Sequence, residues 1–503
     1  MDHTPIIENA GPELASPTPA AQPLKRRTER FAPQHTRILT KFFSPGGPSR
    51  MRNVIERVLG LSQEDVVHEL DMVFTDFAHR HRRFTESLLR HYRQVSGLIP
   101  EGTEVSRERE LLIGSYFTHE YSVSAAAMFN PSIVPHFDQS GLPPGAMRFI
   151  MSFRATGEGH ISSVEFRSGM IDAGGDLHFD PASSFIEMSE VMIDESFDKR
   201  LFGLKLREIG TDQEVYAAIL DKLNDEFTLP QLEEAIRSIH RPRRRMNAGQ
   251  REAIEAVLWL AASNYTVTFP AEHDISERVL FPISESESRG IEDARFVRFV
   301  DNDGTATYYA TYTAYNGIRI LPQLIQTTDF VTFKILTLNG EAVQNKGMAL
   351  FPRRINGKYA MLGRQDGENL YVMFSDHIHF WYDRTLLARP HRPWEFIQIG
   401  NNGSPLETEA GWLVLTHGVG PMRKYSMACM LLDLDDPTKI IGRMNSPLLA
   451  PNTEEREGYV PNVVYTCGAM LHNDVLVIPY SMSDYFSGIA TIPLADLLRE
   501  LAR

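Results

Sequence analysis

The segment from Arg289 to Arg295 carries the side chains of this sequence best suited to moving a proton. It reads RGIEDAR, so the carboxylates of Glu292 and Asp293 lie between two arginines, directly before an apolar run typical of a strand. The residues could form a solvated turn whose charges neutralise one another, or one carboxylate could be a proton donor at the entrance of a site. A donor at neutral pH needs a raised pKa, which burial or the neighbouring Glu292 would supply and inward-pointing arginines would oppose.

Basic and hydrogen-bonding side chains follow further along the chain, among them Lys346, Arg364, His417 and Tyr425. Taken singly, Lys346 could be a solvated loop lysine, and His417 could be a hydrogen-bonded core histidine.

Repeated pairs of strands would have to bring these residues together. Four segments share a plan in which an apolar strand reaches a tight turn and returns as a second apolar strand. The turn glycines Gly304, Gly357 and Gly411 are 53 and 54 residues apart (357 − 304 and 411 − 357), and the turn Asn473-Asp474 follows. An earlier stretch, AMRFIMSFRATGEGHISSVEFRSG, supplies a fifth candidate. This period suits a four-stranded blade and predicts a mainly β fold, a five-bladed β-propeller whose equivalent positions meet around one axis.

Helical patterns accompany the strands. Apolar residues recur at intervals of three to four from about Arg50, and SQED at Ser62 is a capping-box-like helix start. The basic run Arg241–Arg245 is interpreted as a solvated connector between helices. We predict a disordered tail over residues 1–49 and a helical extension over residues 50–120. Residues 121–503 are predicted to form the propeller, with a helical insertion at about 197–262.

Composition narrows the class of protein. The chain has 503 residues, a formal net charge of −14 and 42% hydrophobic residues, which is ordinary for a soluble globular protein. It contains no apolar run of about 18 residues, and its acidic balance disfavours general nucleic-acid binding. Two cysteines, Cys429 and Cys467, are too few for a disulfide framework or a four-ligand zinc site. With no secretion signal at the N-terminus, we expect a cytoplasmic protein that binds neither membrane nor nucleic acid and needs no metal or cofactor.

Five ordered blocks of sequence stand out: GIEDARF, NKGMALFP followed by GKYAMLGR, GSPLETEAGWLVLTHG, LLDLDDPTKIIGR and the ending PYSMSD. They resemble glycoside hydrolase family 130, the mannoside phosphorylases and related mannosidases. The resemblance runs from about Asn130 to the C-terminus, outside the helical insertion. It implies a five-bladed propeller that cleaves β-mannosides with inversion. In the phosphorylases of this family, inorganic phosphate is the co-substrate and α-mannose 1-phosphate is released.

The resemblance also implies roles for individual residues. Asp293 is the acid, which passes its proton to the glycosidic oxygen through a hydroxyl of the bound mannosyl unit. Lys346 and Arg364 match phosphate-contact positions, with His417 and Tyr425 expected as further donors. The positions that match the mannosyl subsite are Asn130, Arg154 and Asp484.

One position departs from the family pattern. PLETEAGW places Glu407 where many of the phosphorylases have a lysine. A carboxylate repels phosphate but could activate water in an inverting hydrolase, whose two carboxyl groups stand roughly 6.5 to 9.5 Å apart. Phosphorolysis is therefore the preferred function, an inverting β-mannosidase using Glu407 is the alternative, and a non-catalytic carbohydrate-binding propeller is the third. The expected partners are a β-mannoside oligosaccharide and phosphate, with a possible homo-oligomer through the helical extension.

Overall fold

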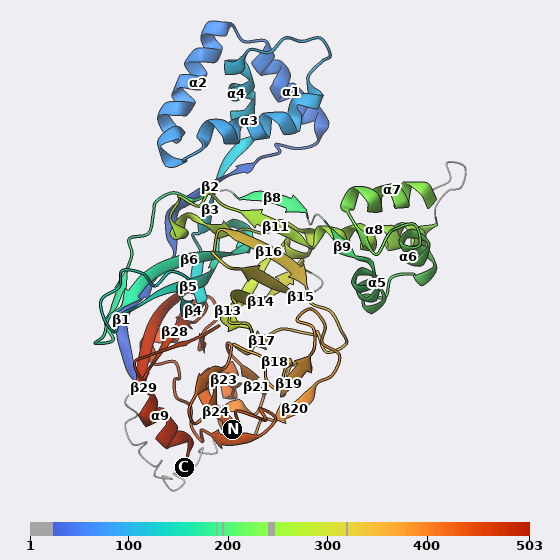
Figure 1. Cartoon of the computed structure of the whole chain (residues 1–503). Coiled ribbons are helices and arrows are strands. Elements are labelled where there is room, and N and C mark those ends of the chain that lie inside the picture. The colour runs from blue at the N-terminus through green and yellow to red at the C-terminus, as the bar shows by residue number, and fades with distance from the viewer. Residues whose placement is uncertain (1–23, 188, 194–195, 240–246, 318–319, 503) are drawn as a thin grey trace, which may run out of the picture.

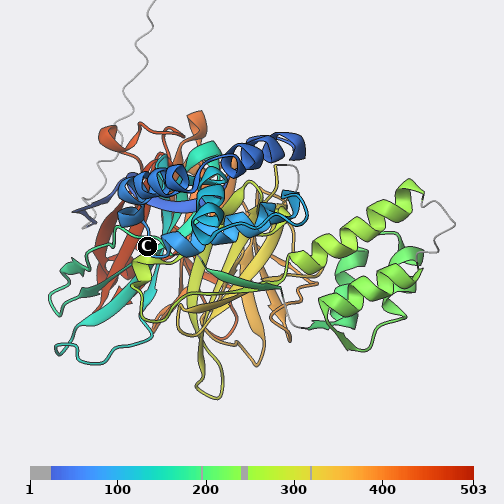
Figure 2. The ribbon, with the colours of Figure 1, turned by 90° about the horizontal axis from the view of Figure 1, so that it is seen from above.

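The chain folds into a strand-rich body with two groups of helices attached to it. The computed structural model describes residues 24–187, 189–193, 196–239, 247–317 and 320–502, and it is mainly β. One helical group lies above the body and the other projects from its side (Figure 1). The view from above confirms that the second group extends away from the body (Figure 2). The predicted connector Arg241–Arg245 lies outside these residues.

Over the residues that the structure describes, the strands of the body form four sheets of 11, 4, 5 and 5 strands, whose neighbours are mostly antiparallel. The 11-stranded sheet divides into two groups at its parallel bridge, which gives five groups in all. The first group contains β4 (Ala127–Pro135), β5 (Met147–Thr156), β6 (Ser162–Ile171), β7 (Leu177–Phe179) and β12 (Val279–Leu280). The second contains β13 (Gly290–Val300), β14 (Ala306–Tyr315), β15 (Ile320–Thr327), β16 (Thr332–Thr337), β11 (Tyr265–Thr268) and β8 (Glu190–Ile193). A parallel bridge between Gly290 and Ser162 joins these two groups.

Three further groups follow in chain order. The third contains β17 (Ala349–Leu350), β18 (Tyr359–Gly363), β19 (Leu370–Ser375) and β20 (Thr385–Ala388). The fourth contains β21 (Gln398–Asn401), β22 (Leu406–Thr408), β23 (Gly411–Val419), β24 (Tyr425–Leu432) and β25 (Ile440–Arg443). The fifth contains β26 (Val464–Tyr465), β27 (Met470–His472), β28 (Val475–Met482), β29 (Phe486–Pro493) and β1 (Lys25–Phe31).

Each group contacts the next one in the chain. β13 contacts β4, β14 contacts β17, β18 and β19 contact β21, and β24 contacts β26. β28 of the fifth group contacts β4 of the first, so the succession of contacts returns to the group where it began.

The predicted strand pairs are confirmed at their turns. Gly304 joins β13 to β14 and Gly357 joins β17 to β18, with φ of 84° and 79°. Asn473 and Asp474 join β27 to β28 with φ of 45° and 60°. Left-handed backbone of this kind is accessible to glycine without strain and to Asn and Asp at small cost, which is why these residue types marked the turns. Gly411 begins β23, and the earlier strand-rich stretch forms the β5–β6 hairpin.

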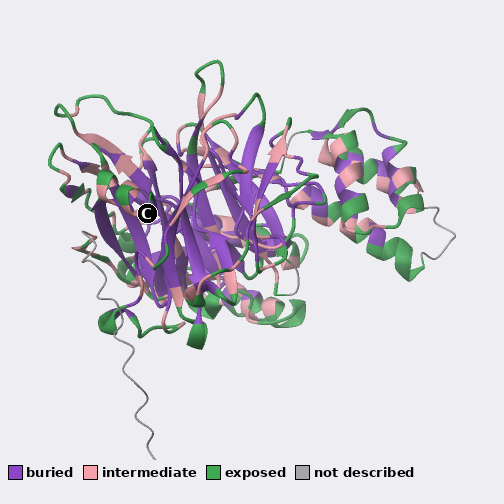
Figure 3. Ribbon diagram, turned by 90° about the horizontal axis from the view of Figure 1, so that it is seen from below, coloured by how far each residue is buried: buried purple, intermediate pink, exposed green. Residues whose placement is uncertain are grey.

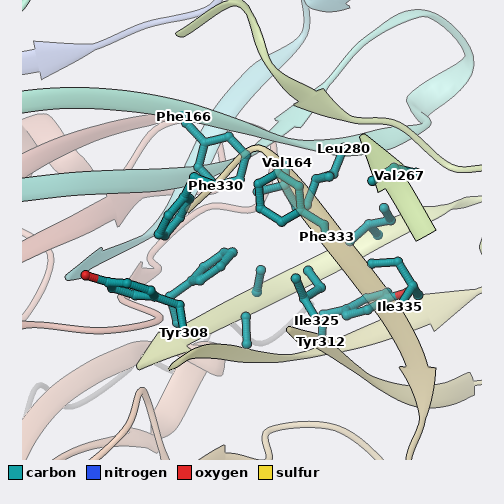
Figure 4. Packing of buried hydrophobic residues seen from close by; sticks show 14 of the residues in the cluster. Val164, Phe166, Val267, Leu280, Tyr308, Tyr312, Ile325, Phe330, Phe333 and Ile335 are labelled. Carbon is teal, nitrogen blue, oxygen red and sulfur yellow. The ribbon is translucent and has the colours of Figure 1, made fainter. Parts of the chain in front are cut away.

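The core lies between the strand groups. The strands of the body are buried along most of their length, whereas the helices keep exposed faces (Figure 3). Aromatic rings fill the space between the first and second groups (Figure 4). Phe166 of β6 packs edge-on against Phe330, with ring centroids 5.6 Å apart, and stacks on Phe333 at 5.8 Å. Such rings remove large apolar areas from water and fix the two groups against each other.

The N-terminal region differs from the predicted tail. Residues 1–23 lie outside the described part, but Lys25–Phe31 forms β1, which pairs with β29, and Gln34–Phe42 forms β2, which pairs with β3 (Thr118–Ser124). The prediction of disorder up to residue 49 was therefore wrong for these strands. Their partners are distant in sequence, so local composition carried no sign of the pairing.

The helical extension contains α1 (Pro48–Leu59), α2 (Gln63–Phe77), α3 (Phe84–Val95) and α4 (Arg107–Tyr116). The Ser62 hydroxyl caps α2 by accepting a hydrogen bond of 3.1 Å from the Asp65 amide, as its sequence predicted. The extension contacts the body through Arg82, whose guanidinium donates to both carboxylate oxygens of buried Glu277 at 2.7 and 2.6 Å. Arg83 lies 3.2 Å from Glu187 beside it.

The helical insertion contains α5 (Lys199–Glu208), α6 (Gln213–Leu220), α7 (Leu229–Ile239) and α8 (Ala248–Ala262), within the range where helices were expected. Two side chains of α5 bind the body: Lys205 Nζ donates to the Leu338 carbonyl at 2.7 Å, and Glu208 Oε1 accepts from the Gly340 amide at 2.7 Å. α9 (Leu494–Leu501) ends the described chain. No described helix is both long and apolar enough to span a bilayer.

Candidate active site

Asp293 lies on an irregular part of β13. The register of β13 against β14 shifts between Glu292 and Arg295, and Asp293 has φ of 56°. β4 has a similar shift between Phe129 and Ser132, where Asn130 has φ of 46°. A bulge with a left-handed residue turns a side chain out of the regular alternation of a strand. Both irregularities therefore direct a polar side chain toward the same place.

The Asp293 carboxylate is surrounded by donors. Asn130 Nδ2 donates to its Oδ1 at 2.7 Å, and Arg154 Nη1 lies 3.4 Å from the same oxygen. Arg295 Nη2 lies 3.8 Å from Oδ2. The side chain is 15% exposed, so the carboxylate remains accessible at the surface of an otherwise buried cluster. The structure thus brings three predicted site residues, Asp293, Asn130 and Arg154, into contact.

Glu292 connects this cluster to Lys346. Its Oε1 accepts from Arg154 Nη2 at 2.8 Å, and its Oε2 lies 2.7 Å from Lys346 Nζ. Lys346 lies in the segment between β16 and β17, which leads into the third strand group. The Glu292 carboxylate therefore binds Lys346 from this segment and Arg154 from the first group. The other arginine of the motif, Arg289, is exposed and does not join them.

The protonation of Asp293 differs from the expectation of a raised pKa. Burial by itself would raise the pKa of this carboxyl, but Arg154, Arg295, the Asn130 hydrogen bond and Lys346 outweigh burial and lower the pKa to about 2. Asp293 is therefore ionised in the site without substrate. The expected raised value was wrong because Arg295 points inward and Arg154 comes from another strand group.

The carboxyl with a raised pKa is Asp484. Burial and the neighbouring charge of Asp293 raise its pKa to about 6, against the opposing effect of Arg154 and Arg423. It lies in the turn between β28 and β29 with φ of 52°. Ser481 Oγ, at the end of β28, donates to Asn130 Oδ1 at 2.8 Å and ties this turn to the cluster. Asp484 therefore lies in the same cluster as Asn130 and Arg154, the other residues predicted to bind the mannosyl unit.

Arg295 and Tyr465 belong to the site although the sequence did not mark them as functional. The Arg295 side chain is 1% exposed and donates to the Asn402 carbonyl at 2.6 Å, to the Asp293 carbonyl at 3.0 Å and to the Tyr465 hydroxyl at 2.9 Å. The position of Arg295 two residues after Asp293 could have suggested its role. Tyr465 lies in a short strand without a motif, so no local signal could have found it.

Tyr465 also lies next to His417 and Tyr425, two of the predicted phosphate donors. Its ring packs edge-on against His417 with centroids 5.0 Å apart, and Tyr425 stacks on the same imidazole at 5.9 Å. His417 is fully buried, and burial together with the charges of Arg364 and Arg295 holds its pKa well below the usual range. It is therefore a neutral hydrogen-bonding group.

Arg364 lies beside this histidine with little free space. A Cβ at Gly347 would come within 2.8 Å of Arg364 Nε, and one at Gly400 would come within 2.6 Å of His417 Cε1. Only glycine backbones at these two positions allow the guanidinium and the imidazole to lie as they do. Arg364, His417 and Tyr425 thus form one group, linked to Asp293 through Tyr465 and Arg295.

Glu407 does not belong to the site, contrary to the sequence-based alternative. Its carboxylate forms a two-point ion pair with Arg353, at 2.9 and 2.6 Å, and is 44% exposed. In the sheet it pairs with Trp412, five residues before His417 on β23. At about 3.3 Å per residue this places it on the order of 16 Å along the strand from the histidine. The spacing of the family motif had suggested proximity, but the two ends of one strand are far apart.

Residues 250–503 match the sequence model of a family described as beta-1,4-mannooligosaccharide phosphorylase. The chain belongs to this family, glycoside hydrolase family 130. A 1,2-beta-oligomannan phosphorylase of Thermoanaerobacter sp. (strain X514) is 34% identical over 42% of this chain and 72% of the relative. A beta-1,2-mannobiose phosphorylase of Listeria innocua is 31% identical over 44% of this chain and 63% of the relative.

Solved structures resemble this family 130 chain over a longer stretch. A beta-1,2-mannobiose phosphorylase from Listeria innocua, in complex with beta-1,2-mannobiose, covers 76% of this chain and 93% of its own, with 22% identity and a TM-score of 0.44. The sequence match to the family begins at residue 250, later than the predicted start near Asn130. Asn130 and Arg154 thus lie before the matched region, and it is their contacts with Asp293 and Glu292 that place them in the site.

Proposed function

We propose that this chain cleaves β-mannosides with inorganic phosphate, inverts the anomeric carbon and releases α-mannose 1-phosphate. Membership of the family supports the reaction class. The observation that carries the proposal is the group of cations and neutral donors around Asp293, which includes Arg154, Arg295 and Lys346. Such a site suits a doubly charged nucleophile, because each phosphate oxygen needs a donor to replace its water. Glu407, the carboxylate that would activate water in the alternative, is bound to Arg353 instead.

The residues divide between the two substrates. Arg364, His417 and Tyr425 form the phosphate side together with Lys346, and Asn130, Arg154 and Asp484 hold the hydroxyls of the mannosyl unit. A phosphate oxygen forms the new bond to the anomeric carbon while the bond to the glycosidic oxygen breaks. Asp293 gives its proton to a hydroxyl of the mannosyl unit, which passes a proton to the departing oxygen. The products are α-mannose 1-phosphate and a saccharide shorter by one unit.

Phosphate itself can prepare Asp293 for this step. In the free site, Arg154, Arg295 and Lys346 stabilise the ionised carboxylate. A bound phosphate brings negative charge close to the same cations and repels the carboxylate charge, and both effects raise the pKa of Asp293. Asp293 would thus gain its proton only when phosphate is bound. The apparent pKa of Asp293 in the pH profile of kcat should therefore be higher than its pKa in the free enzyme.

We also propose that the five strand groups are blades around one central axis. The support is the succession of contacts that runs through the groups and returns from β28 to β4. On this arrangement the catalytic unit includes all five groups, with β1 in the fifth. The helical extension and the helical insertion are additions to that unit.

Phosphate dependence tests the proposal. β-1,2- and β-1,4-linked mannosides are incubated with and without phosphate, and mannose 1-phosphate is measured. We expect this product only when phosphate is added, and a loss of about 10²- to 10⁴-fold in Asp293→Asn, the range for removal of a general acid. Asp303→Asn, which changes an exposed turn residue near the same strand, should behave as the wild type. Free mannose released at equal rates with and without phosphate would contradict phosphorolysis.

A further inference from the structure

Two exposed aromatic rings stack on each other next to the site. His160 and Tyr459 have ring centroids 5.4 Å apart and an interplanar angle of 26°. Tyr459 is 67% exposed, and His160 is exposed with φ of 57°. The two rings come from different strand groups, the first and the segment before β26. Neither takes part in the contacts around Asp293, so the proposed reaction does not yet explain them.

Both rings are attached to segments that bind the proposed mannosyl residues. His160 lies in the β5–β6 turn, which begins three residues after Arg154 at Gly157. Tyr459 follows Gly458, where a Cβ would come within 2.5 Å of the Ser483 carbonyl, directly before Asp484. The ring pair therefore lies at the edge of the site formed by Arg154 and Asp484.

The backbone holds the His160 turn firmly. Gly157 N donates to the Ile161 carbonyl at 3.1 Å, and the Tyr121 hydroxyl donates to the Glu158 carbonyl at 2.9 Å. A Cβ at Gly157 would lie 2.1 Å from the Ser122 carbonyl oxygen, so this backbone approaches its neighbour as closely as glycine permits. Because this turn is already held, little backbone freedom is lost when a ligand binds to the His160 ring.

The position of the rings fits the leaving group. The phosphate-side residues Arg364, His417 and Tyr425 connect to Asp293 through Tyr465 and Arg295. The rings lie instead beside Arg154 and Asp484. In an inverting displacement the nucleophile and the leaving group are on opposite faces of the reacting carbon. The departing saccharide would therefore extend on the side away from the phosphate donors.

We propose that Tyr459 and His160 form a subsite for the leaving saccharide, a neutral mannose unit whose C–H face stacks on the aromatic rings. The proposal rests on the proposed phosphorolysis. The face of an aromatic ring carries negative charge density and attracts the C–H groups of a sugar, and stacking of this kind needs no charged residue. Tyr459 and His160 thus contribute to substrate length and to acceptor binding in the reverse reaction.

Separate Michaelis constants test this subsite. In Tyr459→Ala we expect the KM for β-mannotriose to rise about tenfold, equivalent to about 1.4 kcal/mol, with the KM for phosphate unchanged. In the synthetic direction, the KM for the acceptor mannose should rise while that for mannose 1-phosphate stays constant. Tyr459→Phe keeps the ring and should behave almost as the wild type. His160→Ala should show a smaller rise than Tyr459→Ala.

Tyr382 offers a matched control. It is 49% exposed and stacks on Phe380, with centroids 6.2 Å apart at 26°, in the segment before β20. Tyr382→Ala should leave every constant unchanged. An unchanged saccharide KM in Tyr459→Ala, or an equal change in the phosphate KM, would overturn the subsite. If the wild type formed no phosphate-dependent product, the proposed function would fail instead, and calorimetric binding of mannotriose to wild type and Tyr459→Ala would still decide the subsite.

Discussion

Asp293 and Asp484 are neighbouring half-buried carboxyls whose pKa values move in opposite directions. Arg154, Arg295 and Lys346 hold the pKa of Asp293 at about 2. Asp484 shares Arg154 with Asp293 and also feels Arg423, but burial and the charge of Asp293 raise its pKa to about 6. Near pH 5 the pair therefore carries one negative charge, on Asp293, and one proton, on Asp484.

This raised pKa has a consequence for stability. An unfolded aspartate loses its proton near pH 4, whereas folded Asp484 keeps its proton up to about pH 6. Stability should therefore fall as the pH rises from 4 to 6, because the folded state binds more protons there. Asp484→Asn removes this effect, and we expect the free energy of unfolding to increase by about 2 kcal/mol at pH 8 and to change little at pH 4, while phosphorolysis falls.

Denaturant unfolding at pH 4 and pH 8 measures this difference. Asp474→Asn is the control, because Asp474 is also a left-handed turn residue but is exposed. An equal change in Asp484→Asn at both pH values would show that the pKa of Asp484 is not raised in the folded state.

Gly400 controls the space beside Arg364 and His417, the proposed phosphate donors. A Cβ there would lie 2.6 Å from His417 Cε1 and 3.1 Å from Arg364 Cδ. His417 is fully buried, so it cannot move into solvent to make room. We expect Gly400→Ala to reduce the free energy of unfolding by about 1–3 kcal/mol and to raise the KM for phosphate several-fold.

Steady-state kinetics with varied phosphate and a denaturant titration check the two effects. Gly97→Ala is the control, since a Cβ at Gly97 meets no atom within 4 Å. A normal phosphate KM in Gly400→Ala would mean that Arg364 and His417 do not contact phosphate.

At the scale of the elements, the α5 helix of the insertion holds the segment that leads to Lys346. Glu208 accepts from the Gly340 amide, and Lys205 donates to the Leu338 carbonyl. The segment continues for six residues from Gly340 to Lys346, whose amine reaches Glu292 at 2.7 Å. We expect Glu208→Ala to loosen this segment and to raise the KM for phosphate about three- to tenfold, equivalent to about 0.7–1.4 kcal/mol of lost binding.

The side-chain oxygen of Glu208 makes the contact, so Glu208→Gln should restore nearly normal kinetics. Glu214→Ala changes an exposed glutamate of the same insertion and should have no effect. If Glu208→Ala left the phosphate KM unchanged, the insertion would not influence the position of Lys346.

Much of the element pattern could be predicted from the sequence, because turns and helix caps are local. Gly304, Gly357 and the Asn473-Asp474 turn marked hairpins through the backbone conformations they tolerate. The association of Asp293 with Lys346, Arg364 and His417 followed from the family motifs. Glu407 was misplaced because a motif does not show which end of a strand reaches the site. The pKa of Asp293 and the pairing of β1 depend on partners more than 100 residues away, which no local pattern contains.

At the scale of the whole molecule, arginines at the start of α3 join the helical extension to the body. Arg82 binds both oxygens of Glu277, which is 1% exposed, and lowers its pKa against the effect of burial. Arg82→Ala would leave this carboxylate buried without its main partner. Because Arg82 is itself 39% exposed, we expect a loss of about 2 kcal/mol, less than for a fully buried pair.

The loss should depend on pH. With its pKa lowered, Glu277 contributes stability above the pKa of an unfolded glutamate, and that contribution disappears as the carboxyl gains a proton in acid. The effect of Arg82→Ala in scanning calorimetry should therefore be large at pH 8 and small at pH 4. Arg80→Ala is the control, since its partner Glu120 is partly exposed at 23%. Equal losses in the two variants at pH 8 would contradict a special role for Arg82. The predicted homo-oligomer through the helical extension stays a prediction.

The pairing of β1 with β29 has a consequence for synthesis of the protein. Lys25 lies opposite Thr491, 466 positions later (491 − 25), so β1 leaves the ribosome long before its partner exists. A nascent strand that waits unpaired can attach to the wrong edge or to another polypeptide. The sequence of β1, KRRTERF, contains four basic side chains, and their repulsion keeps waiting copies apart until the last strand is made.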